Sequence, residues 1–146
     1  MMNEIKIESD VNEILENDGI EMQDHGNGVS IEITSLDQLI QENSKYNSWA
    51  KRIIDTSSSG FFQIATMISQ TKENGCRKHM HPDCDEVWVI MRGSFRCLVG
   101  NNVYEVSQGD VVFTKKGIPH QITVTSDEPG IRFSIAVDNQ KNYYNV

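Results

Sequence analysis

The stretch Gly75–Gly93, GCRKHMHPDCDEVWVIMRG, decides how this sequence is interpreted. His79 and His81 stand two residues apart, so on an extended backbone both imidazoles project to the same side. Glu86 follows after a predicted tight turn and opens the next strand. Two histidines and one carboxylate form a donor set that suits a divalent transition metal ion such as iron, manganese, nickel, cobalt or zinc. The stretch therefore predicts part of a metal site.

Alternation along the strand that starts at Glu86 predicts which face carries the carboxylate. Glu86, Trp88 and Ile90 share one face. If that face points into the interior of a β-sheet protein, the carboxylate meets the two imidazoles above an apolar floor.

A fourth candidate ligand lies in the downstream stretch QGDVVFTKKGIPH, residues 108–120. Its glycines and proline predict turns on either side of a short strand, Val111–Thr114. His120 then opens a further strand, with apolar Ile122 and Val124 on its own face. Three of only four histidines in the chain thus fall at positions where an interior metal site needs them.

These two stretches resemble the two motifs of the cupin family. Lys115 stands where the second motif usually has proline, Val124 stands where it usually has asparagine, and Gly75 lies two residues closer to the histidine pair than is usual. The matching positions are Gly75, His79, His81, Glu86 and Gly93 in the first motif and Gly109, Gly117 and His120 in the second.

The resemblance covers about residues 60–137 and has three implications. It implies an all-β fold of the cupin type, a double-stranded β-helix or jelly-roll barrel. It implies that His79, His81, Glu86 and His120 hold one divalent transition metal ion. It also implies a homodimer, because small cupins commonly form dimers.

The pattern along the chain divides it into two parts, an extension over residues 1–50 and a β-barrel over residues 51–146. The extension is predicted to hold an acidic arm, a short strand over Val29–Ile33 and a short helix capped by Ser35. In the barrel, runs rich in β-branched and aromatic residues alternate with turn residues. They predict strands at Lys51–Asp55, Phe61–Gln70, Asp85–Met91, Phe95–Val99, Val103–Val106, Val111–Thr114, His120–Thr125 and Ile131–Val137.

The composition limits the partners and the compartment. The formal net charge of −8 disfavours nucleic acid and anionic membranes as partners. No apolar run approaches the roughly 20 residues of a membrane span, and no export signal is visible, so we expect a cytoplasmic protein. Free thiols are then expected at Cys76, Cys84 and Cys97.

The function expected from these features is a metal-dependent small-molecule enzyme. A dioxygenase, an isomerase or a lyase acting on a carboxylate- or enol-bearing substrate would each suit such a site, and Glu86 is a candidate general base. The alternative is a non-catalytic, metal-dependent ligand-binding or sensor domain, because a fold does not determine a function. Four arginines are candidates for holding a substrate anion, namely Arg77, Arg92, Arg96 and Arg132.

Overall fold

The computed structural model describes residues 7–9, 19–24, 35–54, 63–137 and 140–146, and the predicted strand Val29–Ile33 lies outside them. No helix within these ranges is long and apolar enough to cross a membrane. The elements are β1 (Ile7–Ser9), β2 (Met22–Asp24), α2 (Leu36–Glu42), β3 (Trp49–Ile54), β4 (Gln63–Gln70), β5 (Glu86–Arg92), β6 (Ser94–Val99), β7 (Asn102–Ser107), β8 (Val111–Thr114), β9 (His120–Val124), β10 (Gly130–Val137) and β11 (Asn142–Tyr143).

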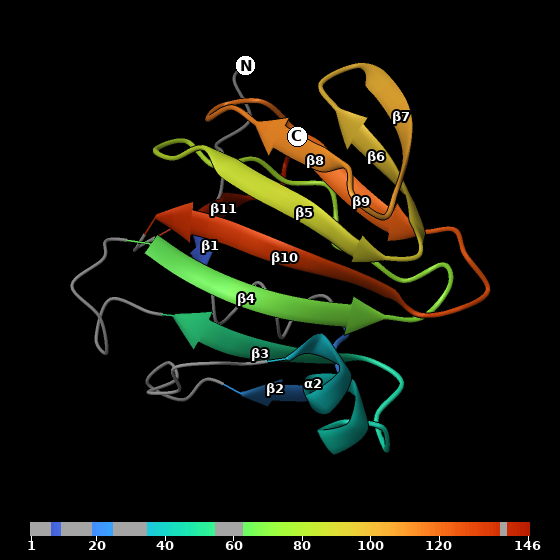
Figure 1. Cartoon of the computed structure of the whole chain (residues 1–146). Helices are drawn as coiled ribbons and strands as arrows, with labels where there is room; N and C mark the ends of the chain where they lie inside the picture. The colour runs from blue at the N-terminus through green and yellow to red at the C-terminus, as the bar shows by residue number, and fades with distance from the viewer. Residues whose placement is uncertain (1–6, 10–18, 25–34, 55–62, 138–139) are drawn as a thin grey trace.

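The described residues form two main sheets and a two-stranded sheet of β1 and β11. The larger sheet has six strands in the order β2-β3-β4-β10-β5-β8, which follow one another from bottom to top in Figure 1. The smaller sheet has three strands in the order β7-β6-β9. Isolated bridges between Gly75 and Thr123 and between His79 and His120 attach the segment before β5 to the edge of β9. A bridge from Met80 to Tyr143 then links this segment to β11, which pairs with β1.

The main core lies between the two sheets, because each strand that lines it buries every second residue. β5 buries Glu86, Trp88 and Ile90, and β9 buries His120, Ile122 and Val124, so both faces predicted from the sequence point inward. The core cluster consists of Cys76, Trp88, Ile90, Phe95, Cys97, Val112, Ile122 and Val124. β5 and β9 thus each present a potential metal ligand at their first residue, next to buried apolar residues of the core.

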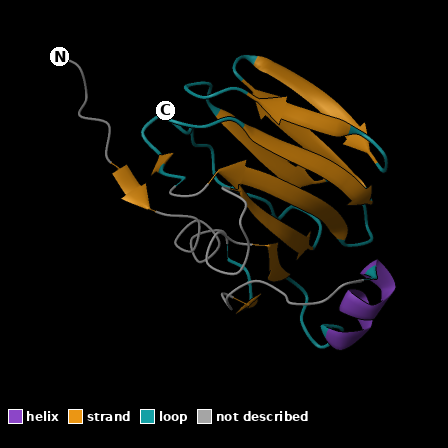
Figure 2. Ribbon diagram, turned by 60° about the vertical axis from the view of Figure 1, so that its left-hand side comes forward, coloured by secondary structure: helices purple, strands orange, loops and turns teal. Residues whose placement is uncertain are grey.

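The helix α2 packs against one end of the outer face of the larger sheet, and it lies below the strands in Figure 2. Its N-terminus is capped by the Ser35 hydroxyl, which accepts a hydrogen bond from the Gln38 backbone N–H at 3.0 Å, as the sequence predicted. Leu39 packs with Trp49 and Met67 in a second apolar cluster. This cluster fixes the outer face of the strands whose inner face borders the candidate site.

The expected all-β fold is confirmed. The predicted strand Val111–Thr114 has the observed bounds, and five of the other seven differ from prediction by one residue at one or both ends. β3 begins two residues before its predicted start, and the predicted start of β4 at Phe61 lies outside the described residues. The short strands β1, β2 and β11 were not predicted, because each is defined by pairing with a distant segment and not by a run of apolar residues.

Candidate metal centre

Four side chains converge at one end of the main core. His79, His81, Glu86 and His120 each offer a ligand atom, and these atoms all lie within 4.8 Å of one another. Their exposed fractions are 3%, 1%, 7% and 0%, so the cluster is shielded from bulk water. The structure therefore brings together all four residues predicted as metal ligands.

Backbone pairing places two of the four imidazoles. His79 and His120 exchange hydrogen bonds, with N···O distances of 3.0 and 2.7 Å between the backbone N–H of one and the carbonyl of the other. Nearby, the backbone of Gly75 lies against β9 so closely that a Cβ atom there would sit 1.8 Å from the Ile122 carbonyl oxygen. Only glycine permits this approach, and the approach fixes the segment that carries His79.

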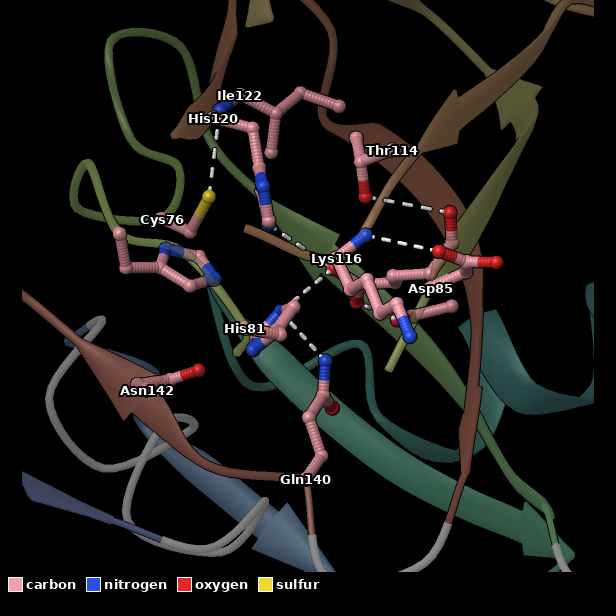
Figure 3. Close-up of polar contacts among 12 residues, drawn as sticks. Cys76, His81, Asp85, Thr114, Lys116, His120, Ile122, Gln140 and Asn142 are labelled. Carbon is pink, nitrogen blue, oxygen red and sulfur yellow. Dashed lines mark hydrogen bonds and ion pairs between the residues drawn. The ribbon is translucent and has the colours of Figure 1, made fainter. Parts of the chain in front are cut away.

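The loop that precedes His120 positions His81 and Glu86. The Gly117 backbone N–H donates to the His81 carbonyl at 2.6 Å. The Lys116 backbone N–H donates to the Asp85 carboxylate at 2.8 Å, immediately before Glu86 (Figure 3). Hydrogen bonds beside the candidate ligands thus connect the two sequence motifs to each other.

Each imidazole has the same orientation toward the backbone. The Nδ1 atoms of His79, His81 and His120 lie 2.6, 2.9 and 2.9 Å from the carbonyl oxygens of Arg77, Lys141 and Ile118, respectively. A carbonyl oxygen only accepts hydrogen bonds, so each Nδ1 carries a proton. The neutral ring then presents a lone pair at Nε2, the form in which histidine binds metal ions.

The remaining donor atoms face one another. The Nε2 atoms of His81 and His120 lie 3.2 and 3.4 Å from the same oxygen of Glu86, Oε2. With Nδ1 protonated, two nitrogen lone pairs and a carboxylate would repel one another at these distances. A cation among them, either a proton or a metal ion, would remove this repulsion. Three imidazole nitrogens and one carboxylate oxygen fit a divalent transition metal ion.

The electrostatics of the site keep His79 neutral and Glu86 ionised. Burial, together with the nearby His120 and His81, lowers the pKa of His79 to about 3. Burial by itself raises the pKa of Glu86, but the His120 and His81 imidazoles beside its Oε2 outweigh burial and hold the pKa well below its usual value. Both residues are thus in the protonation state that metal binding requires at neutral pH.

Two further residues contact the cluster, and neither was predicted from the sequence. The Ser134 hydroxyl on β10 donates to Glu86 Oε1 at 2.6 Å. The amide nitrogen of Gln140 lies 2.6 Å from His81 Nε2 (Figure 3). Gln140 is 4% exposed and belongs to the C-terminal segment that also supplies the Lys141 carbonyl. Ser134 could have been suspected as a polar residue between the apolar Phe133 and Ile135, whereas Gln140 carries no comparable signal.

The four candidate arginines occupy different environments. Arg77 is exposed and stacks on the Tyr144 ring, with its guanidinium carbon 3.9 Å from the ring centroid. Arg92 and Arg96 are exposed and form ion pairs with acidic residues. Arg132 alone is buried, with 3% of its surface exposed.

The cysteines are free and buried, as expected from the sequence. Burial raises the pKa of Cys97 to about 12, and burial together with nearby acidic groups raises the pKa of Cys84 to about 11. The Cys76 sulfur accepts a hydrogen bond from the Ile122 backbone N–H at 3.3 Å (Figure 3). Cys84 and Cys97 are therefore protonated thiols at neutral pH.

Comparison with known proteins places this arrangement in a family. A family model described as "Cupin domain" matches residues 65–136. An uncharacterised protein of Sinorhizobium fredii, y4oW, is 34% identical over 77 residues, which make up 52% of this chain and 35% of that protein. The chain thus aligns with about a third of the length of that relative.

Two solved structures are similar in fold. A protein from Klebsiella pneumoniae with a double-stranded β-helix domain has a TM-score of 0.62 at 20% identity, covering 75% of this chain and 87% of that one. A predicted oxalate decarboxylase from Thermotoga maritima has a TM-score of 0.58 at 16% identity, covering 61% of this chain and 78% of that one. Residues 65–136 of the chain thus form a domain of the cupin superfamily.

Proposed function

We propose that this protein is a metal-dependent enzyme that acts on a small carboxylate- or enol-bearing molecule. The observation that carries the proposal is the convergence of two imidazole Nε2 atoms on Glu86 Oε2, at 3.2 and 3.4 Å, with every Nδ1 proton directed to a backbone carbonyl. A divalent ion bound there would supply Lewis-acid chemistry, or redox chemistry if it is iron or manganese.

The residues of the chain would hold and orient this centre. The hydrogen bond from Ser134 occupies one oxygen of Glu86 and leaves the other facing the imidazoles. Trp88 packs edge-on against His120, with ring centroids 5.4 Å apart, and keeps that ring from rotating. Because the four ligand side chains are almost fully buried, charges that develop on a bound substrate would be stabilised more strongly than in water.

A carboxylate or enol substrate is proposed for a chemical reason. Such groups bind hard or borderline cations through oxygen, and Lewis-acid assistance lowers the barrier to forming an enolate. The fold neighbour from Thermotoga maritima is described as a predicted oxalate decarboxylase, which would also act on a carboxylate. At 16% identity that likeness shows the fold, and the substrate class remains our inference.

The proposal is tested by two activity measurements on metal-loaded protein. With iron(II), oxygen uptake is followed in the presence of a panel of 2-oxo acids and enols, where uptake indicates a dioxygenase. With zinc(II) or manganese(II), exchange of substrate C–H protons for deuterium is followed by NMR, where exchange indicates an isomerase or lyase. Either signal should disappear in His120→Ala. Binding of panel members without oxygen uptake or proton exchange would contradict the enzyme and favour the alternative, a metal-dependent sensor.

A further inference from the structure

A group of buried polar side chains lies inside the fold beside the metal cluster. Thr66 and Gln70 on β4 and Arg132 on β10 are 3%, 0% and 3% exposed. Arg132 stands opposite Ile68 on β4 and Ile90 on β5, and both of these residues are buried. The three polar side chains therefore project from the inner face of the larger sheet.

These side chains present hydrogens that have no acceptor. Arg132 Nη1 donates to Gln70 Oε1, while Arg132 Nε and Gln70 Nε2 have no hydrogen-bond partner among the residues that the structure describes. The orientation of the Gln70 amide follows from this contact, because a guanidinium group can only donate. The Thr66 hydroxyl is likewise without a partner. Buried donors are nearly always paired in folded proteins, so these three call for an acceptor that the described residues do not supply.

The positive charge of the buried Arg132 side chain also indicates a ligand that carries negative charge. No carboxylate among the described residues forms an ion pair with Arg132, whose guanidinium carbon lies 5.9 Å from the centroid of the Trp88 ring. A buried, unpaired cation is costly unless something compensates for it. A bound anion would supply both the missing charge and the missing acceptors.

The group is placed to act together with the metal cluster. Trp88 lies between them, since its ring also contacts His120 at a centroid distance of 5.4 Å. Ala136 pairs with Glu86, and it lies four residues beyond Arg132 along β10, about 13 Å at roughly 3.3 Å per residue. One extended small molecule could therefore reach both places.

We propose that Arg132, Gln70 and Thr66 form a carboxylate-binding site, which anchors one end of a ligand whose other end reaches the cluster of His79, His81, Glu86 and His120. The inference rests on the proposed function, of which it specifies the substrate class as an extended dicarboxylate or a carboxylate with a second metal-binding group. A carboxylate matches a guanidinium in shape and in charge, because two parallel N–H bonds meet its two oxygens. A phosphate dianion would leave negative charge uncompensated by Arg132.

The test compares matched ligands by calorimetry on zinc-loaded protein. Succinate, adipate and suberate are titrated beside butyrate, hexanoate and octanoate. One dicarboxylate of the series is expected to bind at least tenfold more tightly than the monocarboxylate of the same length. Arg132→Gln should abolish that advantage. Arg96→Gln, which removes the same charge at an exposed ion pair, should behave as the parent protein.

A second variant guards against a loss of folding. Thr66→Val keeps the shape of the side chain and removes the hydroxyl, and it should weaken dicarboxylate binding severalfold. Equal binding of dicarboxylates and monocarboxylates to the parent protein, or full affinity in Arg132→Gln, would overturn the inference. If inorganic phosphate binds more tightly than the dicarboxylate and displaces it, the assignment to a carboxylate would be overturned.

Zinc content, measured on the same samples, distinguishes this inference from the proposed function. Zinc bound by Arg132→Gln with no loss of dicarboxylate affinity refutes the anchoring site alone. If the parent protein binds no zinc, the proposed function fails. In that case the metal-free parent protein and metal-free Arg132→Gln are titrated with the same dicarboxylates. If Arg132 binds a carboxylate without metal, the variant should have the lower affinity.

Discussion

The Ser134 hydroxyl donates a hydrogen bond of 2.6 Å to Glu86 Oε1, so that only Oε2 of this carboxylate faces the imidazoles. β10 and β5 are neighbours in the larger sheet, and the two side chains project from the same inner face. The contact determines both the orientation of the carboxylate and the number of oxygens it can offer to a metal ion.

Removing this hydrogen bond should weaken metal binding. In Ser134→Ala, Glu86 is free to rotate, and we expect the affinity for zinc to fall by about 10- to 100-fold, the usual effect of losing a residue that orients a ligand. Competition with a chromophoric chelator measures the change. Ser69→Ala serves as the control, because Ser69 lies opposite Trp49 and Ile131, which belong to the outer-face cluster. Unchanged affinity in Ser134→Ala would show that the hydroxyl plays no part in orienting Glu86.

Gln140 should compete with the metal ion. Its amide nitrogen lies 2.6 Å from His81 Nε2, the atom through which His81 would bind the metal, so this hydrogen bond must break when the metal enters. A hydrogen bond contributes about 1 kcal/mol, and Gln140→Ala should therefore tighten zinc binding by about fivefold. The same chelator competition measures it. Weaker binding in the variant would mean instead that the amide turns over and its oxygen joins the ligand set.

Close packing at Gly75 predicts a large loss of stability on adding one methyl group. A Cβ atom at this position would lie 1.8 Å from the Ile122 carbonyl oxygen, so the segment before β5 would have to separate from β9. We expect Gly75→Ala to lower the free energy of unfolding by about 3 kcal/mol or more. Gly109→Ala is the control, because Gly109 has a φ of +93° but open space around it, and it should cost roughly 1–2 kcal/mol. Urea unfolding followed by circular dichroism measures both; similar losses would contradict the packing argument.

The sequence predicted the ligand set because it depends on local spacing. His79 and His81 share a face in any extended chain, and Glu86 and His120 each begin a strand whose alternation was readable. The remaining contacts depend on long-range pairing. Gln140 reaches His81 only because the C-terminal segment pairs with Met80 through Tyr143.

The arginines illustrate the same limit. Arg132 was one of four candidates of equal standing in the sequence. Its burial follows from the central position of β10 between β4 and β5, whereas Arg96 lies on the outer face of β6 and forms an exposed ion pair. Strand order and register, which the sequence did not provide, decide which arginine faces the interior.

The lowered pKa of His79 predicts how acid affects the metal-free protein. In the unfolded chain a histidine titrates near 6.5, whereas in the fold its pKa is about 3. Between these values the unfolded state binds the proton and the native state does not, so stability falls as the pH decreases. The loss approaches about 1.4 kcal/mol per pH unit from this residue.

Urea unfolding of the metal-free protein at pH 7 and at pH 4.5 measures this effect. His79→Asn removes the titrating group and should show a smaller loss of stability between the two pH values than the parent protein. An equal loss in both proteins would show that His79 titrates normally in the fold.

The central claim is that His79, His81, Glu86 and His120 together hold one metal ion. It is tested most directly by elemental analysis of protein purified without a metal-chelating tag and then reconstituted, beside His79→Ala and His120→Ala. We predict close to one equivalent of a divalent transition metal ion per chain in the parent protein and a large loss in both variants. A parent protein that stays free of metal after reconstitution, or variants that bind as much as the parent, would contradict the claim.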